Sequence, residues 1–194
     1  FELAYMKTHY YGGIKKYQWA SIPLALHGVV ILENGKLVEI VIGEKDNDPV
    51  FTIPDILPHL AAKIQGDRKT GEVIKGEELQ IIVGSIPTTI DNKEIKSKVK
   101  YAVLEILNRD YGIIEEDFIS AELELVPAGK ARDIGFDQSM IGAYGQDDRI
   151  CGYTSMRAIT DLEKTPDKTA ICFLADKEEI GSSGSTGLKS DYLA

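Results

Sequence analysis

The sequence has few cysteines, fewer basic than acidic residues, and no long hydrophobic run. Two cysteines in 194 residues, Cys151 and Cys172, are too few for the disulfide framework of a small secreted domain, which favours a reducing cytoplasm. The excess of 31 acidic over 22 basic residues gives a net charge of -9, which disfavours a nucleic-acid or anionic-membrane partner. No apolar run approaches the roughly 18 residues of a membrane span and no signal peptide opens the chain, so we expect no membrane partner.

The composition is that of an ordinary globular protein. Hydrophobic residues make up 43% of the chain and charged residues 27%, which is enough to bury a core in one or two domains. The first residue is Phe1 rather than methionine, and Ala194 ends the chain in what reads as a loop or an early helix. We therefore expect the chain to be a piece of a longer protein.

Local patterns predict a series of elements in the first 126 residues. The clearest is a β hairpin around Asn34-Gly35, a dipeptide that tolerates the positive φ angles of a tight turn. Spacing of apolar residues and the positions of proline and glycine predict the others. They are a helix over 54–65, a buried strand over 79–83, an amphipathic helix over 93–108, and a strand with one solvated face over 118–126.

The remainder of the chain changes character after Pro127. A stretch rich in glycine and aspartate has little periodicity, and a helix is then predicted from about Arg149. The apolar run Thr169–Ala175 predicts a buried strand, in which Cys172 would be a packed thiol. Strand and helix alternate here, which indicates an α/β fold.

Two acidic pairs follow predicted core elements: Asp147 with Asp148, and Glu178 with Glu179. Ligands in α/β proteins gather beyond the carboxyl ends of strands, so these carboxylates are candidates for a metal-assisted hydrolase site. In such a site some carboxylates hold the metal and a free one moves the proton. The alternative is that both pairs lie on solvated loops, with Asp148 as the N-cap of the helix near Arg149.

Four longer stretches occur in a fixed order: KTHYYGGIKKYQWASIPLALHG, ELELVPAGKARDIG, AYGQDDRICGYTS and FLADKEEIGSSGSTG. Together they resemble the aminopeptidase I / aspartyl aminopeptidase family of dizinc exopeptidases, and the similarity extends through essentially the whole chain. The resemblance implies an α/β, three-layer zinc-peptidase domain of the phosphorylase/hydrolase-like type. It also implies an inserted α+β dimerisation domain, which interrupts that domain.

The resemblance assigns roles to individual residues. Asp147 would bridge two zinc ions, with a cis peptide bond to Asp148; Glu178 would be the general base, and Glu179 would bind one zinc ion. Cobalt or manganese could replace zinc, since oxygen-rich sites discriminate weakly among these metals. Thiolate ligation by Cys151 would depart from the family pattern, so we expect this thiol to pack in the core. A His, an Asp and a second His of the family's ligand set are expected outside this segment, so the segment alone is expected to bind zinc poorly and to be inactive.

The resemblance also implies the domain layout and the partners. Residues 1–20 and 129–194 would belong to the proteolytic domain, and residues 21–128 to the dimerisation domain. His59, in the inserted domain, would reach into the partner subunit's active site and contact the peptide substrate. Dimers would assemble further into tetrahedral dodecamers in the cytoplasm.

Two alternatives remain open from the sequence. The chain could be a non-catalytic dimerisation or assembly module, with its acidic pairs on solvated loops. It could also belong to a related dizinc peptidase that cleaves other amide bonds. The sequence does not indicate which amino-terminal residue of the substrate is preferred.

Overall fold

The computed structural model describes residues 2–177, 187 and 189, and the chain divides into two compact units. The larger unit comprises residues 1–10 and 14–128, and the smaller one comprises residues 11–13 and 129–194. The division falls between Ala128 and Gly129, close to the change of character seen in the sequence. Residues 1–10 and 14–20 fall in the larger unit, together with 21–128. The assignment of 1–20, 21–128 and 129–194 to proteolytic and dimerisation domains stays a prediction.

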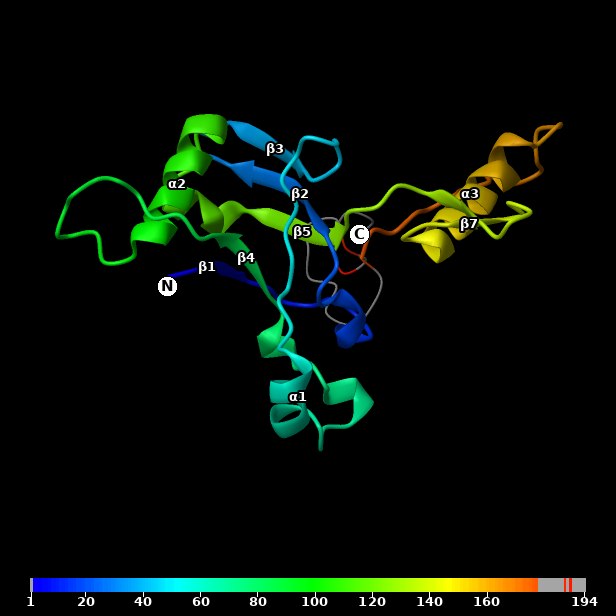
Figure 1. Cartoon of the computed structure of the whole chain (residues 1–194). Coiled ribbons are helices and arrows are strands. Elements are labelled where there is room, and N and C mark those ends of the chain that lie inside the picture. The colour runs from blue at the N-terminus through cyan, green and yellow to red at the C-terminus, as the bar shows by residue number, and fades with distance from the viewer. Residues whose placement is uncertain (1, 178–186, 188, 190–194) are drawn as a thin grey trace. The chain divides into compact units, whose positions relative to one another are not determined.

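A three-stranded antiparallel sheet forms the centre of the larger unit (Figure 1). Its strand order is β3 (Leu37–Ile42), β2 (Leu24–Ile31), β5 (Glu122–Pro127). The predicted hairpin is confirmed: β2 pairs with β3 over six residue pairs, and Gly35 in the turn has a φ of 80°. Side chains alternate across the sheet, so one face is apolar and buried. This face contributes most of one core cluster: Leu26, Val30, Ile40 and Ile42, together with Ile113.

Gly28 occupies the middle of the buried face of β2, opposite Ile40 and Leu123. Its φ of 139° lies in a region that favours glycine. A Cβ atom at this position would lie 2.0 Å from the backbone oxygen of Glu122 on β5. The close approach of β2 and β5 therefore requires glycine here.

A second, two-stranded sheet pairs β1 (Ala4–Lys7) with β4 (Gln80–Gly84), which confirms the buried strand predicted over 79–83. Beside it, five buried side chains form a second core cluster: Leu24, Ile53, Ile74, Leu79 and Ile81. Two isolated β-bridges join the segments that contain Leu24 and Ile53: Ala20 pairs with Ile53, and Leu24 pairs with Phe51. The chain therefore enters this cluster at Ile53 and returns to it at Ile74.

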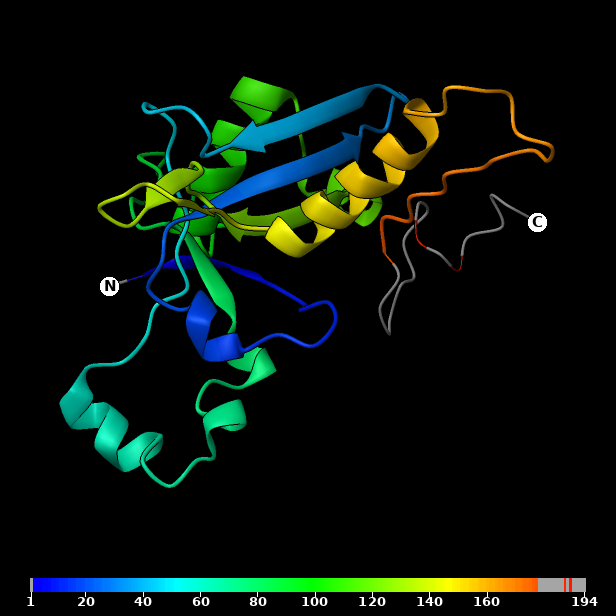
Figure 2. The same cartoon turned by 90° about the vertical axis from the view of Figure 1, so that its right-hand side faces the viewer.

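The two helices of the larger unit differ in how they pack. Helix α2 (Lys98–Tyr111) buries Val99, ends at Gly112 in the left-handed conformation, and is followed by the buried Ile113. Helix α1 (Pro58–Ile64) buries none of its residues and lies away from the sheets in both views (Figures 1 and 2). Tertiary packing therefore stabilises α2 but contributes little to α1.

Both helices begin later than predicted. Helix α1 begins at Pro58 instead of near Pro54, because Pro58 is itself suited to the first helical turn and disfavours helix in the residue before it. Helix α2 begins at Lys98 instead of Lys93, after Ser97. The strand predicted over 118–126 is confirmed only as β5. Its first residues instead belong to a 3-10 helix, Glu115–Ser120.

A buried carboxylate ties that 3-10 helix to the β2–β3 turn. Asp117 is 6% exposed and accepts hydrogen bonds from the backbone N–H groups of Glu33 and Ile114, each at 2.9 Å. Oδ1 of Asp117 accepts from Glu33, and Oδ2 accepts from Ile114, so both carboxylate oxygens are used. A side chain with fewer acceptors would lose one of these partly buried hydrogen bonds.

We expect Asp117→Ala to lower the free energy of unfolding by about 1–3 kcal/mol, because two partly buried hydrogen bonds are lost. Urea denaturation of the full-length protein measures this change. Glu116→Gln is the matched control, since the neighbouring Glu116 is exposed and its substitution should have little effect. Equal midpoints for the two variants would contradict a structural role for Asp117.

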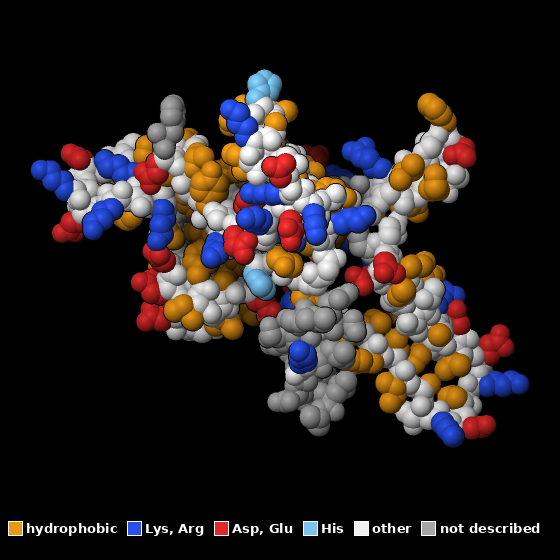
Figure 3. Space-filling model, turned by 90° about the horizontal axis from the view of Figure 1, so that it is seen from below, with side chains coloured by type: hydrophobic (Ala, Val, Ile, Leu, Met, Phe, Trp, Pro, Cys, Tyr) orange, Lys and Arg blue, Asp and Glu red, His pale blue; other side chains and the backbone are white. Residues whose placement is uncertain are grey.

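The smaller unit contains a short hairpin and a helix. Strands β6 (Arg132–Ile134) and β7 (Met140–Gly142) pair in antiparallel fashion, within a stretch where no strand was predicted. Helix α3 spans Gln146–Thr160 and exposes its apolar side chains: Ile150 is 57% exposed, Tyr153 53% and Met156 47%. In Figure 3 hydrophobic side chains are exposed, and acidic and basic ones are interspersed over the surface shown. All buried hydrophobic side chains among the described residues belong to the larger unit.

The prediction of a strand over Thr169–Ala175 is wrong. These residues form neither helix nor strand, and Ile171 is 81% exposed. A strand requires a hydrogen-bonded neighbour, and no described segment pairs with this run. Among the described residues, no helix has both the length and the apolar character needed to cross a bilayer.

Candidate metal centre

Asp147 and Asp148 lie in the first turn of α3. Gly145 is the N-cap of this helix, with a φ of 72°, and Arg149 N donates to the Gly145 oxygen at 3.1 Å. The prediction that the helix begins near Arg149 with Asp148 as its N-cap is therefore wrong: a glycine in the left-handed conformation replaces the expected side-chain cap. Both acidic side chains therefore lie at the end of the helix where acidic residues are favoured, near its unpaired N–H groups.

The carboxylate of Asp147 is exposed, and within the described part of the chain its short-range partner is the thiol of Cys151, whose Sγ lies 3.7 Å from Oδ1. Cys151 is one helical turn later and is itself exposed, so the expectation that it packs in a core is wrong. The described residues contain no cis peptide bond, and the expected cis bond between Asp147 and Asp148 is replaced by the trans geometry that a helix requires.

Glu178 and Glu179 lie outside the described residues, so the convergence of these carboxylates on Asp147 stays a prediction. The chain is described up to Lys177, whose Nζ lies 3.5 Å from Oδ2 of the neighbouring Asp176. Within the described part of the chain, no three His, Cys, Asp or Glu side chains lie close enough together to hold a metal ion. Any metal centre here therefore needs ligands from outside that part.

Asp147 fits the chemistry of a zinc ligand. Zinc binds carboxylate oxygens as well as imidazole and thiolate groups. The Asp147 carboxylate is exposed, and its neighbour Cys151 is a weak donor that competes little with a metal ion. One carboxylate cannot complete the coordination of zinc, so Asp147 is a candidate ligand within a larger set.

His59 is the second residue of α1 and is exposed. Apolar side chains beside it, Leu57 and Leu60, are 68% and 52% exposed. The imidazole therefore lies on a segment that the core does not cover. This position is compatible with contact to another molecule, and the predicted contact with a partner subunit's substrate is not tested by a single chain.

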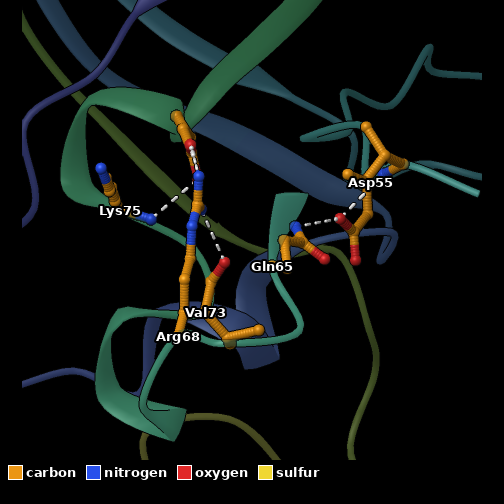
Figure 4. Close-up of polar contacts among 7 residues, drawn as sticks. Asp55, Gln65, Arg68, Val73 and Lys75 are labelled. Carbon is orange, nitrogen blue, oxygen red and sulfur yellow. Dashed lines mark hydrogen bonds and ion pairs between the residues drawn. The ribbon is translucent and has the colours of Figure 1, made fainter. Parts of the chain in front are cut away.

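A polar network holds the segment after α1 (Figure 4). Arg68 forms two hydrogen bonds with Glu78, at 2.8 and 3.0 Å, and a third with the backbone oxygen of Val73 at 3.0 Å. Glu78 also accepts from Lys75 N at 3.0 Å. The guanidinium lowers the pKa of Glu78 below its ordinary value, chiefly through these side-chain hydrogen bonds, and the carboxylate raises the pKa of Arg68. Both groups are therefore charged at neutral pH.

A family model described as aminopeptidase I zinc metalloprotease (M18) matches residues 1–194. The chain belongs to this M18 family. Curated M18 relatives agree with the match. The chain is 62% identical over 192 residues to a probable M18 family aminopeptidase 1 from Borreliella burgdorferi, covering 99% of the chain and 41% of the relative. The corresponding protein from Thermotoga maritima is 54% identical over 191 residues, with coverage of 98% and 41%.

Solved M18 structures have the same fold. The crystal structure of the Thermotoga maritima aminopeptidase matches with a TM-score of 0.84 and 54% identity. The match covers 98% of the present chain and 41% of the Thermotoga maritima protein. Aminopeptidase I from Clostridium acetobutylicum matches with a TM-score of 0.84 and 53% identity, over 96% and 40%. The mApe1 dodecamer from S. cerevisiae shares the fold at 21% identity, with a TM-score of 0.56, over 95% and 40%. The M18 chain thus spans about two fifths of the length of the curated relatives it matches.

Sequence reasoning missed the Arg68–Glu78 pair of this M18 chain. The two residues are ten positions apart and belong to no common helix or strand, so no periodic pattern connects them. The only sequence signal is the combination of an arginine after a helix-terminating glycine, Gly66, with two adjacent glutamates that precede a buried strand. Such combinations are common on surfaces and indicate no particular pairing.

Proposed function

We propose that the complete protein is a metallo-aminopeptidase that removes the amino-terminal residue from short peptides. Membership of the M18 family supports this proposal, and so does the presence of both acidic motifs in the chain. The single observation that carries it within the structure is Asp147, an exposed carboxylate at a helix N-terminus whose partner among the described residues is a thiol. A carboxylate in this state is available to a metal ion.

In this proposal the three acidic residues divide the work. Asp147 and Glu179 hold two zinc ions per subunit, together with ligands from the remainder of the protein, and cobalt or manganese could occupy the same oxygen-rich site. When bound at these residues, zinc would supply Lewis-acid polarisation of the scissile carbonyl and would lower the pKa of the attacking water. Glu178 accepts the proton from that water and returns it to the leaving amine, which requires a carboxylate that does not bind metal.

The proposal extends to architecture and assembly. Residues 1–20 and 129–194 belong to a three-layer proteolytic domain, and residues 21–128 form the inserted dimerisation domain. His59 reaches the substrate site of the partner subunit from α1, which the exposure of that helix supports. Dimers assemble into dodecamers in the cytoplasm, which is an expectation from the family resemblance.

Activity on amino-acid anilides tests the proposal, using the full-length, zinc-loaded protein and paired substrates with free and blocked amino termini. We expect cleavage of the free form and loss of cleavage on blocking, because the free amine and the scissile carbonyl together position the substrate. Equal cleavage of both forms would instead favour a related peptidase that acts on other amide bonds.

Metal content per subunit, measured on the same preparation, addresses the non-catalytic alternative. About two metal ions per subunit are expected for a dizinc site. A full-length protein that binds no metal and cleaves neither substrate would be an assembly module.

A further inference from the structure

The segment between Ile53 and Ile74 leaves the core and returns to it without contributing a buried side chain. Ile53 and Ile74 are 3% and 4% exposed, whereas every described residue between them is at least partly exposed. Helix α1 lies within this excursion, and it extends away from the sheets (Figure 2). An isolated helix of seven residues is not stable in water, so other interactions must hold its position.

Packing beneath the helix is incomplete. A hollow of about 610 Å³ adjoins α1, and its lining includes Tyr17, Asp55, Gln65, Arg68 and Ile74. Ala61, Ala62 and Val73 also line the hollow, so apolar side chains of the segment face open space here as well as polar groups. Dispersion contacts cannot fix the orientation of α1 across such a gap.

Two sets of side-chain hydrogen bonds contribute to fixing the excursion (Figure 4). The side chain of Gln65, just after α1, donates a hydrogen bond at 3.1 Å to the side chain of Asp55, which precedes the helix. This bond joins the two ends of the helical segment. Arg68 then joins the end of the excursion to the core, because its partners Val73 and Glu78 directly precede the buried Ile74 and Leu79. The Arg68 side chain is only 18% exposed, and a bidentate guanidinium–carboxylate pair has a defined geometry.

We propose that Arg68 and Glu78 are positioning residues, which fix the α1 segment so that His59 is presented to the substrate site of a partner subunit. This inference rests on the proposed role of His59 and adds the means by which a helix without core contacts keeps one orientation. The pair acts through the segment and touches no substrate. Its loss should therefore weaken substrate binding more than the chemical step.

Amide hydrogen exchange and steady-state kinetics on the full-length, zinc-loaded enzyme test the inference together. In Arg68→Ala we expect exchange over residues 57–66 to rise by roughly tenfold or more, with exchange in β2 and β3 unchanged. In Arg68→Ala, KM should rise by roughly tenfold, whereas kcat should change by less than about threefold. In the double variant with His59→Ala and Arg68→Ala, KM should be no higher than in His59→Ala alone, because both substitutions remove the same contact. Arg68→Lys keeps one hydrogen bond and should restore part of both effects.

Matched controls separate local from general effects. Arg109→Ala removes an exposed guanidinium that is also bidentate to a carboxylate, Asp110, on helix α2, and it should change neither exchange over 57–66 nor KM. Glu78→Gln keeps the shape of the side chain while removing its charge. Because the glutamine oxygen can still accept one hydrogen bond from Arg68, this variant should reproduce part of the changes seen with Arg68→Ala, and it does so even if Arg68→Ala folds poorly.

The possible results distinguish this inference from the proposed function. Unchanged exchange over 57–66 in Arg68→Ala and Glu78→Gln would overturn the positioning role. Raised exchange with unchanged KM, while His59→Ala raises KM, would also overturn it but leave the proposed function of His59 in place. Raised exchange with KM unaffected by either Arg68→Ala or His59→Ala would overturn both.

Discussion

Glu178→Gln in the full-length enzyme is expected to lower kcat by about a thousandfold while both zinc ions stay bound. Glutamine has nearly the same size as glutamate but cannot accept a proton at neutral pH, so the variant removes general-base catalysis alone. General acid–base catalysis contributes typically 10²–10⁴-fold, which sets the scale of the loss. Steady-state kinetics with a free amino-acid anilide measures kcat, and elemental analysis of the same sample measures zinc.

Two other glutamates supply the controls for this result. Glu179→Gln should lose zinc together with activity, because that carboxylate is proposed as a ligand. Glu163→Gln replaces an exposed glutamate that follows α3, and it should retain both zinc and turnover. Near-normal turnover in Glu178→Gln would remove this residue from the role of base, and loss of zinc would make it a ligand instead.

Gly28→Ala is expected to lower the free energy of unfolding by roughly 3 kcal/mol or more. The new Cβ atom would meet the backbone oxygen of Glu122 at 2.0 Å, and backbone cannot move aside as a flexible side chain can. The φ of 139° adds strain for any residue with a Cβ atom. Relief requires β2 and β5 to separate, which breaks the sheet next to the buried Leu26 and Val30. Urea denaturation of the full-length protein measures the change.

Gly35→Ala separates the steric contact with Glu122 from the backbone strain, the two contributions to the expected destabilisation by Gly28→Ala. Gly35 also has a positive φ, of 80°, but a Cβ atom there would have nothing within 4 Å. Its substitution should therefore cost only about 1 kcal/mol, from backbone strain. A similar loss in both variants would mean that the contact with Glu122 contributes nothing, and that β2 and β5 can separate without penalty.

The elements that the sequence predicted well are those whose signals are local. Asn34-Gly35 determines its hairpin through the φ angles that the turn needs, and Gly112 ends α2 for a similar reason. Leu123 and Leu125 pack into the core as their alternation indicated. Helix starts were less well predicted, because an N-terminus depends on which of several competing caps or prolines is used.

Errors arose where an element depends on a distant partner. The apolar run Thr169–Ala175 has the composition of a buried strand, yet a strand is formed by pairing that the run itself does not encode. The same limit applies to the candidate metal centre. The motifs identified Asp147, Glu178 and Glu179, and the structure places Asp147 at the start of α3, but the ligand set requires segments that no local pattern connects. Arg68 and Glu78 were missed for the same physical reason.

Among the residues that the structure describes, all buried hydrophobic side chains belong to the larger unit, so unfolding cooperativity is unevenly distributed over this described part. The larger unit contains the apolar area whose hydration dominates the heat capacity of unfolding. Backbone hydrogen bonds in α3 and in the β6–β7 hairpin have little such area beside them, so within these 194 residues they can open individually without the cost of exposing a core. Strands β2 and β3 can open only when their core cluster opens with them.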